Sequence, residues 1–94
     1  MPYSAFPVMC VKCSLELVPE TNGVVVKELW RGNTQVYKVW EADLVKCPGC
    51  GILMIKGFAQ SPLAVHHELE RFRAALAYAS KKTQRGECYD LKEE

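Results

Sequence analysis

Cys10-Val11-Lys12-Cys13 and Cys47-Pro48-Gly49-Cys50-Gly51 are the two stretches of this sequence that decide its fold. Each contains a Cys-x-x-Cys pair, which places two thiolates on one tight turn at a separation that suits a single tetrahedral metal ion. Two such turns brought together complete a four-sulfur site, and zinc is the ion that such sites most often hold. The spacing therefore predicts one structural Zn²⁺ with the ligands Cys10, Cys13, Cys47 and Cys50.

Three other chemistries compete for these cysteines. Two disulfides need an oxidising compartment, but residues 1–13 contain no basic start followed by an apolar run of signal-peptide length, so we expect a cytoplasmic protein. A thioredoxin-like redox pair needs one Cys-x-x-Cys beside a βαβ pattern, whereas this chain has two pairs with strand-like sequence between them. Iron stays open, because rubredoxins also bind metal through two such turns and the second turn here resembles theirs, although Ser14 stands where a rubredoxin has glycine.

Composition indicates one small domain. The chain has 94 residues, of which 49% are apolar, and a chain of this size often depends on a metal for stability. No apolar stretch approaches the length needed to cross a bilayer, so we expect no membrane partner. Twelve basic and eleven acidic side chains give a formal charge of +1, so nucleic-acid binding would have to be local.

Residues 1–9 carry Pro2 and Pro7 and indicate an extended lead-in, and residues 10–60 indicate a β domain built on the metal. We expect turns at residues 20–23 and 31–33 and an interruption at residues 41–43. Between them, β-branched, aromatic and apolar runs predict an antiparallel sheet of three or four strands, at residues 15–18, 24–30, 34–40 and 52–55.

The last third of the chain predicts a long amphipathic helix over residues 61–85. Ser61-Pro62 is a strong helix start, and an apolar stripe that should pack on the sheet follows it: Val65, Leu69, Phe72, Leu76 and Ala79. Such a helix exceeds the width of a small sheet, so its far end, with Lys81 and Lys82, could project and bind a partner or pair with a second copy. The fold class is therefore α+β. Residues 86–94 are expected to form a frayed acidic tail in which Cys88 is an unpaired thiol and not a fifth ligand.

Catalytic signatures are missing from the sequence. It has no Gly-rich phosphate loop, no Gly-x-Ser-x-Gly elbow and no His-Glu-x-x-His helix. Four thiolates also close the coordination sphere of a metal, leaving no position for an activated water, so we expect a protein that is not an enzyme. His66 and His67 are adjacent and cannot chelate one ion together as an i, i+4 pair would, so we interpret them as first-turn helix residues. Glu41 and Asp43 would form an acid/base pair only beside a cleft.

The two cysteine pairs, with Cys47-Pro48-x-Cys50-Gly51 as the second, resemble the zinc-ribbon superfamily over about residues 8–58. Its members occur in transcription factors, RNA polymerase subunits, ribosomal proteins and small accessory proteins of bacteria and phages. The stretch 39–46 before Cys47 is similar to short uncharacterised zinc-ribbon proteins of phage and bacterial genomes. The resemblance implies a small antiparallel metal-bound sheet and leaves the role open.

Three functions remain open. The first is a zinc-stabilised adaptor, in the manner of a phage or bacterial accessory or regulatory factor, that binds a protein through Trp30, Tyr37 and Trp40 or through the helix. The second is a nucleic-acid-binding ribbon in which Arg31 and Lys38 contact phosphates while Tyr37 or Trp40 stacks on a base. The third is a rubredoxin-like iron electron carrier.

Overall fold

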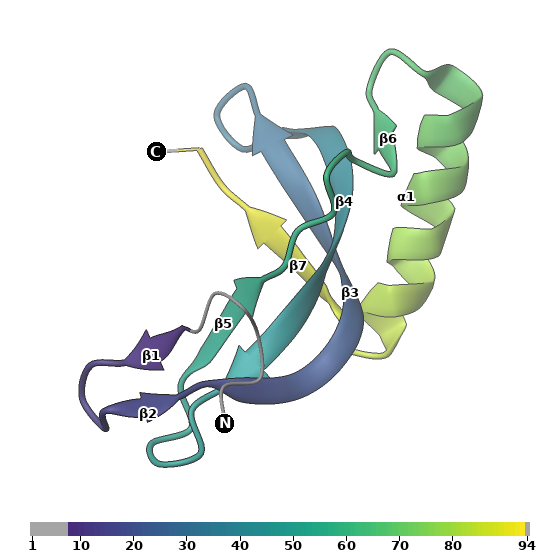
Figure 1. Cartoon of the computed structure of the whole chain (residues 1–94). Coiled ribbons are helices and arrows are strands. Elements are labelled where there is room, and N and C mark those ends of the chain that lie inside the picture. The colour runs from purple at the N-terminus through teal and green to yellow at the C-terminus, as the bar shows by residue number, and fades with distance from the viewer. Residues whose placement is uncertain (1–7, 94) are drawn as a thin grey trace.

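The computed structural model describes residues 8–93 of the chain (Figure 1). Strands dominate it and one helix lies near the C-terminus, which confirms the α+β class. The expected lead-in over residues 1–9 falls mainly outside the described residues, and Met9 already belongs to a strand. In chain order the elements are β1 (Met9–Cys10), β2 (Leu15–Glu16), β3 (Val18–Trp30), β4 (Gln35–Lys46), β5 (Leu53–Lys56), β6 (Ala64–Val65), α1 (Leu69–Gln84) and β7 (Cys88–Leu91).

A long antiparallel hairpin, β3 with β4, is the backbone of the fold. It pairs Trp30 with Gln35 at its tip and Val18 with Lys46 at its base. The turn expected at residues 20–23 lies within β3, and the interruption expected at residues 41–43 lies within β4. Both expectations are wrong because register shifts absorb the strand-breaking residues, between Pro19 and Thr21 and between Asn22 and Val24, where Gly23 adopts a φ of 79°. The strands stay paired and bend.

The sheet is larger than a small ribbon. Five strands join it, in the order β5-β4-β3-β7 with β6 also paired to β4. The frayed tail predicted for residues 86–94 is wrong, because Cys88–Leu91 forms β7, which runs parallel to β3. Beyond it, the backbone N–H of Glu93 donates to the Asn33 side chain at the hairpin tip over 2.7 Å. Residues 88–93 are therefore part of the fold.

Helix α1 begins at Leu69, eight residues after the Ser61 start that the sequence predicts. The backbone of the intervening residues hydrogen-bonds to β4 instead: Leu63 N–H donates to Val39 O over 2.7 Å, and His66 N–H donates to Tyr37 O over 2.9 Å. His66 and His67 therefore precede the helix and do not form its first turn. Within residues 8–93, no helix is long and apolar enough to span a bilayer.

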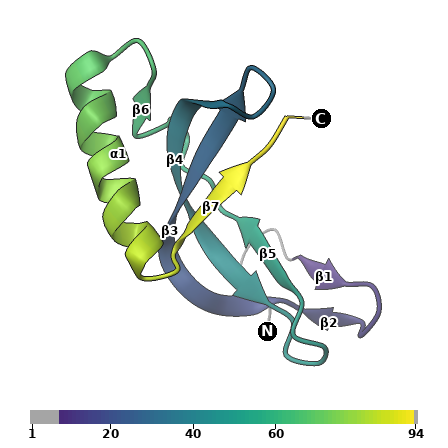
Figure 2. The same ribbon diagram turned by 180° about the vertical axis from the view of Figure 1, so that it is seen from behind.

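The far end of α1 does not project. Lys82 Nζ donates to Gly23 O over 2.9 Å and forms an ion pair with Glu87 at 3.3 Å, and its side chain is only 14% exposed. This anchors the end of the helix to the bent part of β3, and the chain then enters β7 (Figures 1 and 2). The helix lies along one face of the sheet, over its upper half in Figure 1.

Apolar packing occurs on both faces of the sheet. On the helix side, Val25 and Val39 pack against Ala64, Ala75 and Ala79, with Phe72 and Leu76 at the margin. Leu69, which the sequence places in the same stripe, is 71% exposed because it lies at the first turn, beyond the sheet. The opposite face holds a second cluster, and the base of the hairpin holds a third that includes two of the cysteines: Val24, Val26, Ala42 and Leu44 in the second; Cys10, Leu17, Val45 and Cys47 in the third.

Close approach of α1 to the sheet depends on alanine. Ala79 is 2% exposed against Val25 and Val39, so Ala79→Leu should force the helix outward and lower the free energy of unfolding by about 1–3 kcal/mol. Ala77→Leu, on the exposed side of the same helix, should change it by less than about 0.5 kcal/mol. Urea denaturation followed by circular dichroism measures both. Equal effects of the two variants would contradict this packing.

Candidate metal centre

The first cysteine turn is a tight hairpin. β1 and β2 pair antiparallel, with Cys10 opposite Leu15, and Ser14 N–H donates to Cys10 O over 2.8 Å. Ser14 adopts a φ of 57°, the left-handed conformation in which glycine would be unstrained. The turn thus holds Cys10 and Cys13 on one side of the hairpin, and serine at position 14 does not prevent it.

The second cysteine turn continues β4. Cys47 N–H donates to Ile52 O and Gly51 N–H donates to Cys47 O, each over 2.9 Å, which closes the turn. Gly51 has a φ of 82°, a conformation that side-chain-bearing residues rarely adopt. Because Val18 pairs with Lys46 at the base of the hairpin, the two turns meet although they lie far apart in the sequence.

The four cysteine sulfurs gather as predicted. They all lie within 4.8 Å of one another, and Cys10 Sγ is 3.7 Å from Cys50 Sγ. Sulfurs bound to one tetrahedral zinc at 2.3 Å would be separated by about 3.8 Å. A disulfide needs about 2.0 Å, and all four cysteines are free. The donor set therefore fits a metal ion.

Burial differs among the four ligands. Cys47 is fully buried and Cys10 is 8% exposed, whereas Cys13 is half-buried and Cys50 is exposed. The buried pair belongs to the apolar cluster at the base of the hairpin, with Leu17 and Val45. The site thus lies half inside the fold, with its Cys50 side open to solvent.

Hydrogen bonds favour the thiolate form of one of the four cysteines, Cys47. Backbone N–H groups, first that of Cys50 and then that of Gly49, lower the pKa of Cys47 to about 6. The Cys13 thiol donates to Cys47, and this hydrogen bond with burial raises the pKa of Cys13 to about 12. A bound metal would need thiolate ligands, so Cys47 would offer a sulfur that is already negative, whereas Cys13 would have to lose its proton.

Gly49 is required for close packing between the two turns. A Cβ at this position would lie 2.9 Å from Cys13 Sγ and 3.1 Å from Leu15 Cδ1. Even alanine would therefore push the first turn away from the second. The sequence contains this glycine, but its role appears only when the two turns are placed together.

Cys88 is not part of the cluster. It lies on β7 and packs at the margin of the helix-side core, and the group of potential metal ligands found among residues 8–93 consists of the other four cysteines. The placement agrees with the expectation that it is not a fifth ligand.

The aromatic residues singled out in the sequence lie at the opposite end of the long hairpin. Trp30 and Tyr37 stack with ring centroids 4.9 Å apart, and the His66 ring lies 4.7 Å from Trp30 and 5.1 Å from Tyr37. Arg31 lies 4.6 Å from the Trp30 ring, and Lys38 Nζ lies 5.1 Å from that of Tyr37. These side chains come together, and each of the three rings contacts at least two neighbours.

Trp40 also contacts neighbouring side chains. Its Nε1 donates to Glu28 over 2.8 Å, and its ring meets the Phe58 ring edge-on at 6.0 Å. Of the two helix lysines, Lys81 is exposed, whereas Lys82 is half-buried and donates to Gly23 O. The predicted binding residues therefore do not form one surface.

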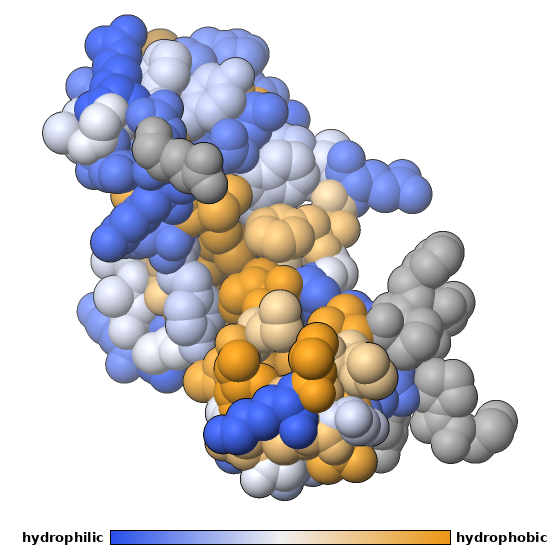
Figure 3. Space-filling model, turned by 90° about the vertical axis from the view of Figure 1, so that its left-hand side faces the viewer, coloured by the Kyte–Doolittle hydropathy of each residue, from blue (hydrophilic) through white to orange (hydrophobic). Residues whose placement is uncertain are grey.

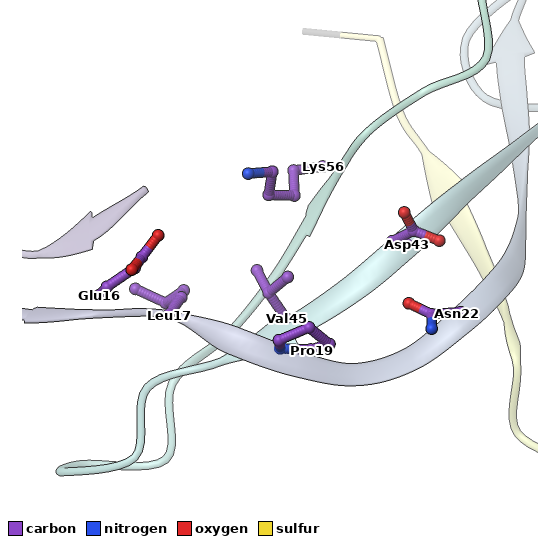
Figure 4. Close-up of a pocket in the computed structure, with 7 residues that line it drawn as sticks. All are labelled: Glu16, Leu17, Pro19, Asn22, Asp43, Val45 and Lys56. Atoms are coloured by element: carbon purple, nitrogen blue, oxygen red, sulfur yellow. The ribbon is translucent and has the colours of Figure 1, made fainter. Parts of the chain in front are cut away.

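A groove lies beside the lower part of β3, β4 and β5, close to the first cysteine turn (Figure 4). Its volume is about 200 Å³, and Leu17, Pro19 and Val45 supply its apolar wall. Asp43 also lines the groove, and its Oδ1 accepts a hydrogen bond from Gly23 N–H over 3.1 Å. Glu41 accepts a hydrogen bond from Tyr78 OH over 3.5 Å. Glu41 and Asp43 thus hydrogen-bond to different residues and are not arranged as an acid/base pair.

The feature that sequence reasoning missed is the apolar surface around the metal site. Large apolar side chains stay exposed on both cysteine turns and on β5, and Figure 3 shows them gathered at the lower end of the molecule. The signal for this surface in the sequence was the apolar run Ile52 to Ile55, which was predicted only as a strand of the sheet. We name this the metal-end apolar surface and define it as Met9, Val11, Leu15, Ile52, Leu53, Met54 and Phe58.

Comparison of the chain with protein-family models, with curated proteins and with solved structures gives no match in any of the three. The likeness to zinc ribbons therefore depends on the cysteine pattern and on the four-sulfur cluster.

A metal ion bound at this cluster would contribute to the stability of the fold. Cys47→Ser should abolish stoichiometric metal binding and unfold the metal end, because a structural zinc contributes on the order of 10 kcal/mol of apparent folding free energy. Cys88→Ser should keep the metal content of the unchanged protein. Elemental analysis with thermal melting measures both variants. Native stability of metal-free Cys47→Ser, or metal loss from Cys88→Ser, would contradict the ligand assignment.

Gly49→Ala should weaken metal affinity on the order of tenfold or more, because its Cβ would contact Cys13 Sγ. Gly32→Ala is the matched control: it lies at the hairpin tip with a φ of 68° and nothing within 4 Å, so it should cost backbone strain without changing affinity. Competition with a chromophoric chelator measures both. Unchanged affinity of Gly49→Ala would contradict the close contact between the turns.

Proposed function

We propose that this chain is a zinc-stabilised protein-binding module, an adaptor whose contact region is the metal-end apolar surface. The observation that carries the proposal is the exposure of that surface. Its seven side chains are 43–87% exposed; six lie on the cysteine turns, their flanking strands and β5, and Phe58 follows β5. Soluble monomers rarely leave so many large apolar side chains exposed in one region unless it binds something.

The size of the surface supports a protein as the ligand. Half-exposed side chains of this kind leave on the order of 100 Å² each in water, so seven offer several hundred Å². A standard protein interface covers about 800 Å² per partner. The surface is thus large enough for the apolar centre of such an interface.

Zinc suits the proposed role. Four thiolates with tetrahedral spacing are a typical structural zinc site, and they leave no coordination position for a reacting water. The ion would fix the first cysteine turn relative to the second. Leu15, next to the first turn, and Leu53, on the strand after the second turn, would then keep fixed positions for a partner. A rubredoxin-like iron site has the same ligands and would make the purified protein coloured, whereas zinc gives colourless protein with one ion per chain.

The other surfaces support binding less well. The rings of Trp30 and Tyr37 already stack, and the His66 ring contacts both of them in tilted geometry, so stacking of a base or a partner side chain would compete with those contacts. With a net charge of +1, several phosphate contacts would have little electrostatic support. On α1, the exposed large apolar residues in the described chain are Leu69 and Tyr78, more than two turns apart.

Site-specific photo-crosslinking tests the proposal. A benzophenone amino acid replaces Leu53 on the metal-end apolar surface or, as a control, Arg73 on the exposed side of α1. After illumination in host cells, position 53 should give a discrete protein adduct and position 73 should not. The Cys47→Ser background should lose the adduct, because the surface needs the metal. Adducts from position 73 alone, or from neither position, would overturn the proposal.

A further inference from the structure

We propose that the metal-end apolar surface binds a second copy of this chain, through antiparallel pairing of β5 with the β5 of its partner about Met54. This inference rests on the proposed function, since it names the partner of the same surface. The result would be one continuous sheet across a two-fold axis, with a metal centre on each side. Four observations lead to it: the open edge of β5, its hydrogen-bond phase, its side chains and its charge.

β5 forms one edge of the sheet. Within residues 8–93 it pairs with β4 alone, through Leu53 with Lys46, Met54 with Val45, Ile55 with Leu44 and Lys56 with Asp43. Such an edge offers unpaired N–H and C=O groups to an added strand. Edge strands that do not associate with other chains usually carry charged residues or proline. Leu53, Met54 and Ile55 include neither, and the one charged residue of β5 is Lys56 at its end.

The phase of the β5 backbone follows from one hydrogen bond. Cys47 N–H donates to Ile52 O, so Cys47 and Ile52 form a hydrogen-bonded pair of the ladder. Such pairs alternate along antiparallel strands, and therefore Met54 is the next residue of β5 to bond to β4. The N–H and C=O groups of Leu53 and Ile55 then point outward, away from the sheet.

Two copies satisfy these outward groups with each other. If Met54 lies opposite Met54 of the second copy, each Leu53 lies opposite an Ile55 and both pairs are hydrogen-bonded, which gives a symmetric set of bonds. The two Met54 residues form a non-hydrogen-bonded pair at the axis, where side chains approach most closely. Leu53 and Met54, 52% and 45% exposed in one copy, become buried.

Charge favours this register. Lys56 falls opposite Ile52 of the second copy and not opposite another Lys56, so no like charges face each other in the strand pair. The net charge of +1 also gives little repulsion between copies. The other edge strand, β7, has its charged residue within the strand: Asp90 forms an ion pair with Lys27 at 3.6 Å. The chain beyond β7 also hydrogen-bonds to the hairpin tip. β5 is thus the edge suited to self-association.

A pair of aspartate variants tests the interface. Met54→Asp would place two carboxylates face to face at the axis, where like charges cost several kcal/mol, so the dimer dissociation constant should rise on the order of 100-fold. Leu69→Asp makes a comparable change on α1, at a more exposed position, and should leave the dissociation constant within about twofold. Sedimentation equilibrium of the metal-loaded full chain measures both. A dimer weakened by Leu69→Asp and not by Met54→Asp would overturn the proposal in favour of helix pairing.

A second pair of variants separates backbone pairing from side-chain contact. Leu53→Pro removes an outward N–H that β4 does not use, whereas Leu53→Ala keeps it and removes most of the side chain. Leu53→Pro should weaken the dimer at least tenfold more than Leu53→Ala, with zinc content and circular dichroism unchanged in both. Equal weakening would overturn strand addition as the mode of contact.

The outcomes distinguish this inference from the proposed function. Unchanged protein that stays monomeric into the millimolar range, while position 53 still crosslinks to a different protein, would overturn the dimer and leave the adaptor standing. A monomer without any adduct at position 53 would overturn both. A dimer that Met54→Asp dissociates, with an adduct between copies at position 53, supports both.

Discussion

The meeting of two cysteine turns at the base of one long hairpin is the constraint on which the rest of the structure depends. β3 and β4 bring the turns together by pairing Val18 with Lys46, and the four sulfurs then lie at separations that suit a single tetrahedral ion. The apolar cluster at this end consists of Cys10, Leu17, Val45 and Cys47, so two of its four buried members are candidate ligands. A bound ion would therefore take the place that apolar side chains occupy in a larger core.

Local features were the ones that could be predicted from the sequence. The cysteine spacing identified the four ligands because Cys-x-x-Cys turns depend on few neighbours, and the 3.6-residue period of Phe72, Leu76 and Ala79 identified the helix. The start of that helix could not be predicted, since Ser61-Pro62 is a good start in isolation. Leu63 and His66 instead hydrogen-bond to β4, and that competition appears only when the strand is already in place.

Long-range pairing explains the other differences. Glu20 to Gly23 has the composition of a turn, but two register shifts accommodate it within β3, and no local rule distinguishes a bulged strand from a hairpin. β7 pairs in parallel with a strand some sixty residues earlier, and its sequence, with Asp90 and Glu93 near the end of the chain, resembles a tail. The helix ends at Gln84, one residue before the predicted end, and Gly86 follows with a φ of 71°. The path of the chain after this glycine could not be predicted, because it depends on β3 having a free edge.

The apolar run after the second cysteine turn shows how the metal and the surface are connected. Ile52 to Ile55 would be a core strand if a layer covered it, but α1 lies over the other half of the sheet and the cluster opposite the helix takes in only Ile55. Leu53 and Met54 are left at the edge. If a metal ion stabilises this end of the domain through the four sulfurs, these side chains are not needed in a core and can remain exposed without loss of the fold. Their position follows from Cys47, whose backbone N–H binds Ile52 O and whose sulfur is a candidate ligand. Loss of a bound metal would therefore disturb the metal-end apolar surface together with the cysteine cluster, and under the proposed function binding would then depend on the metal.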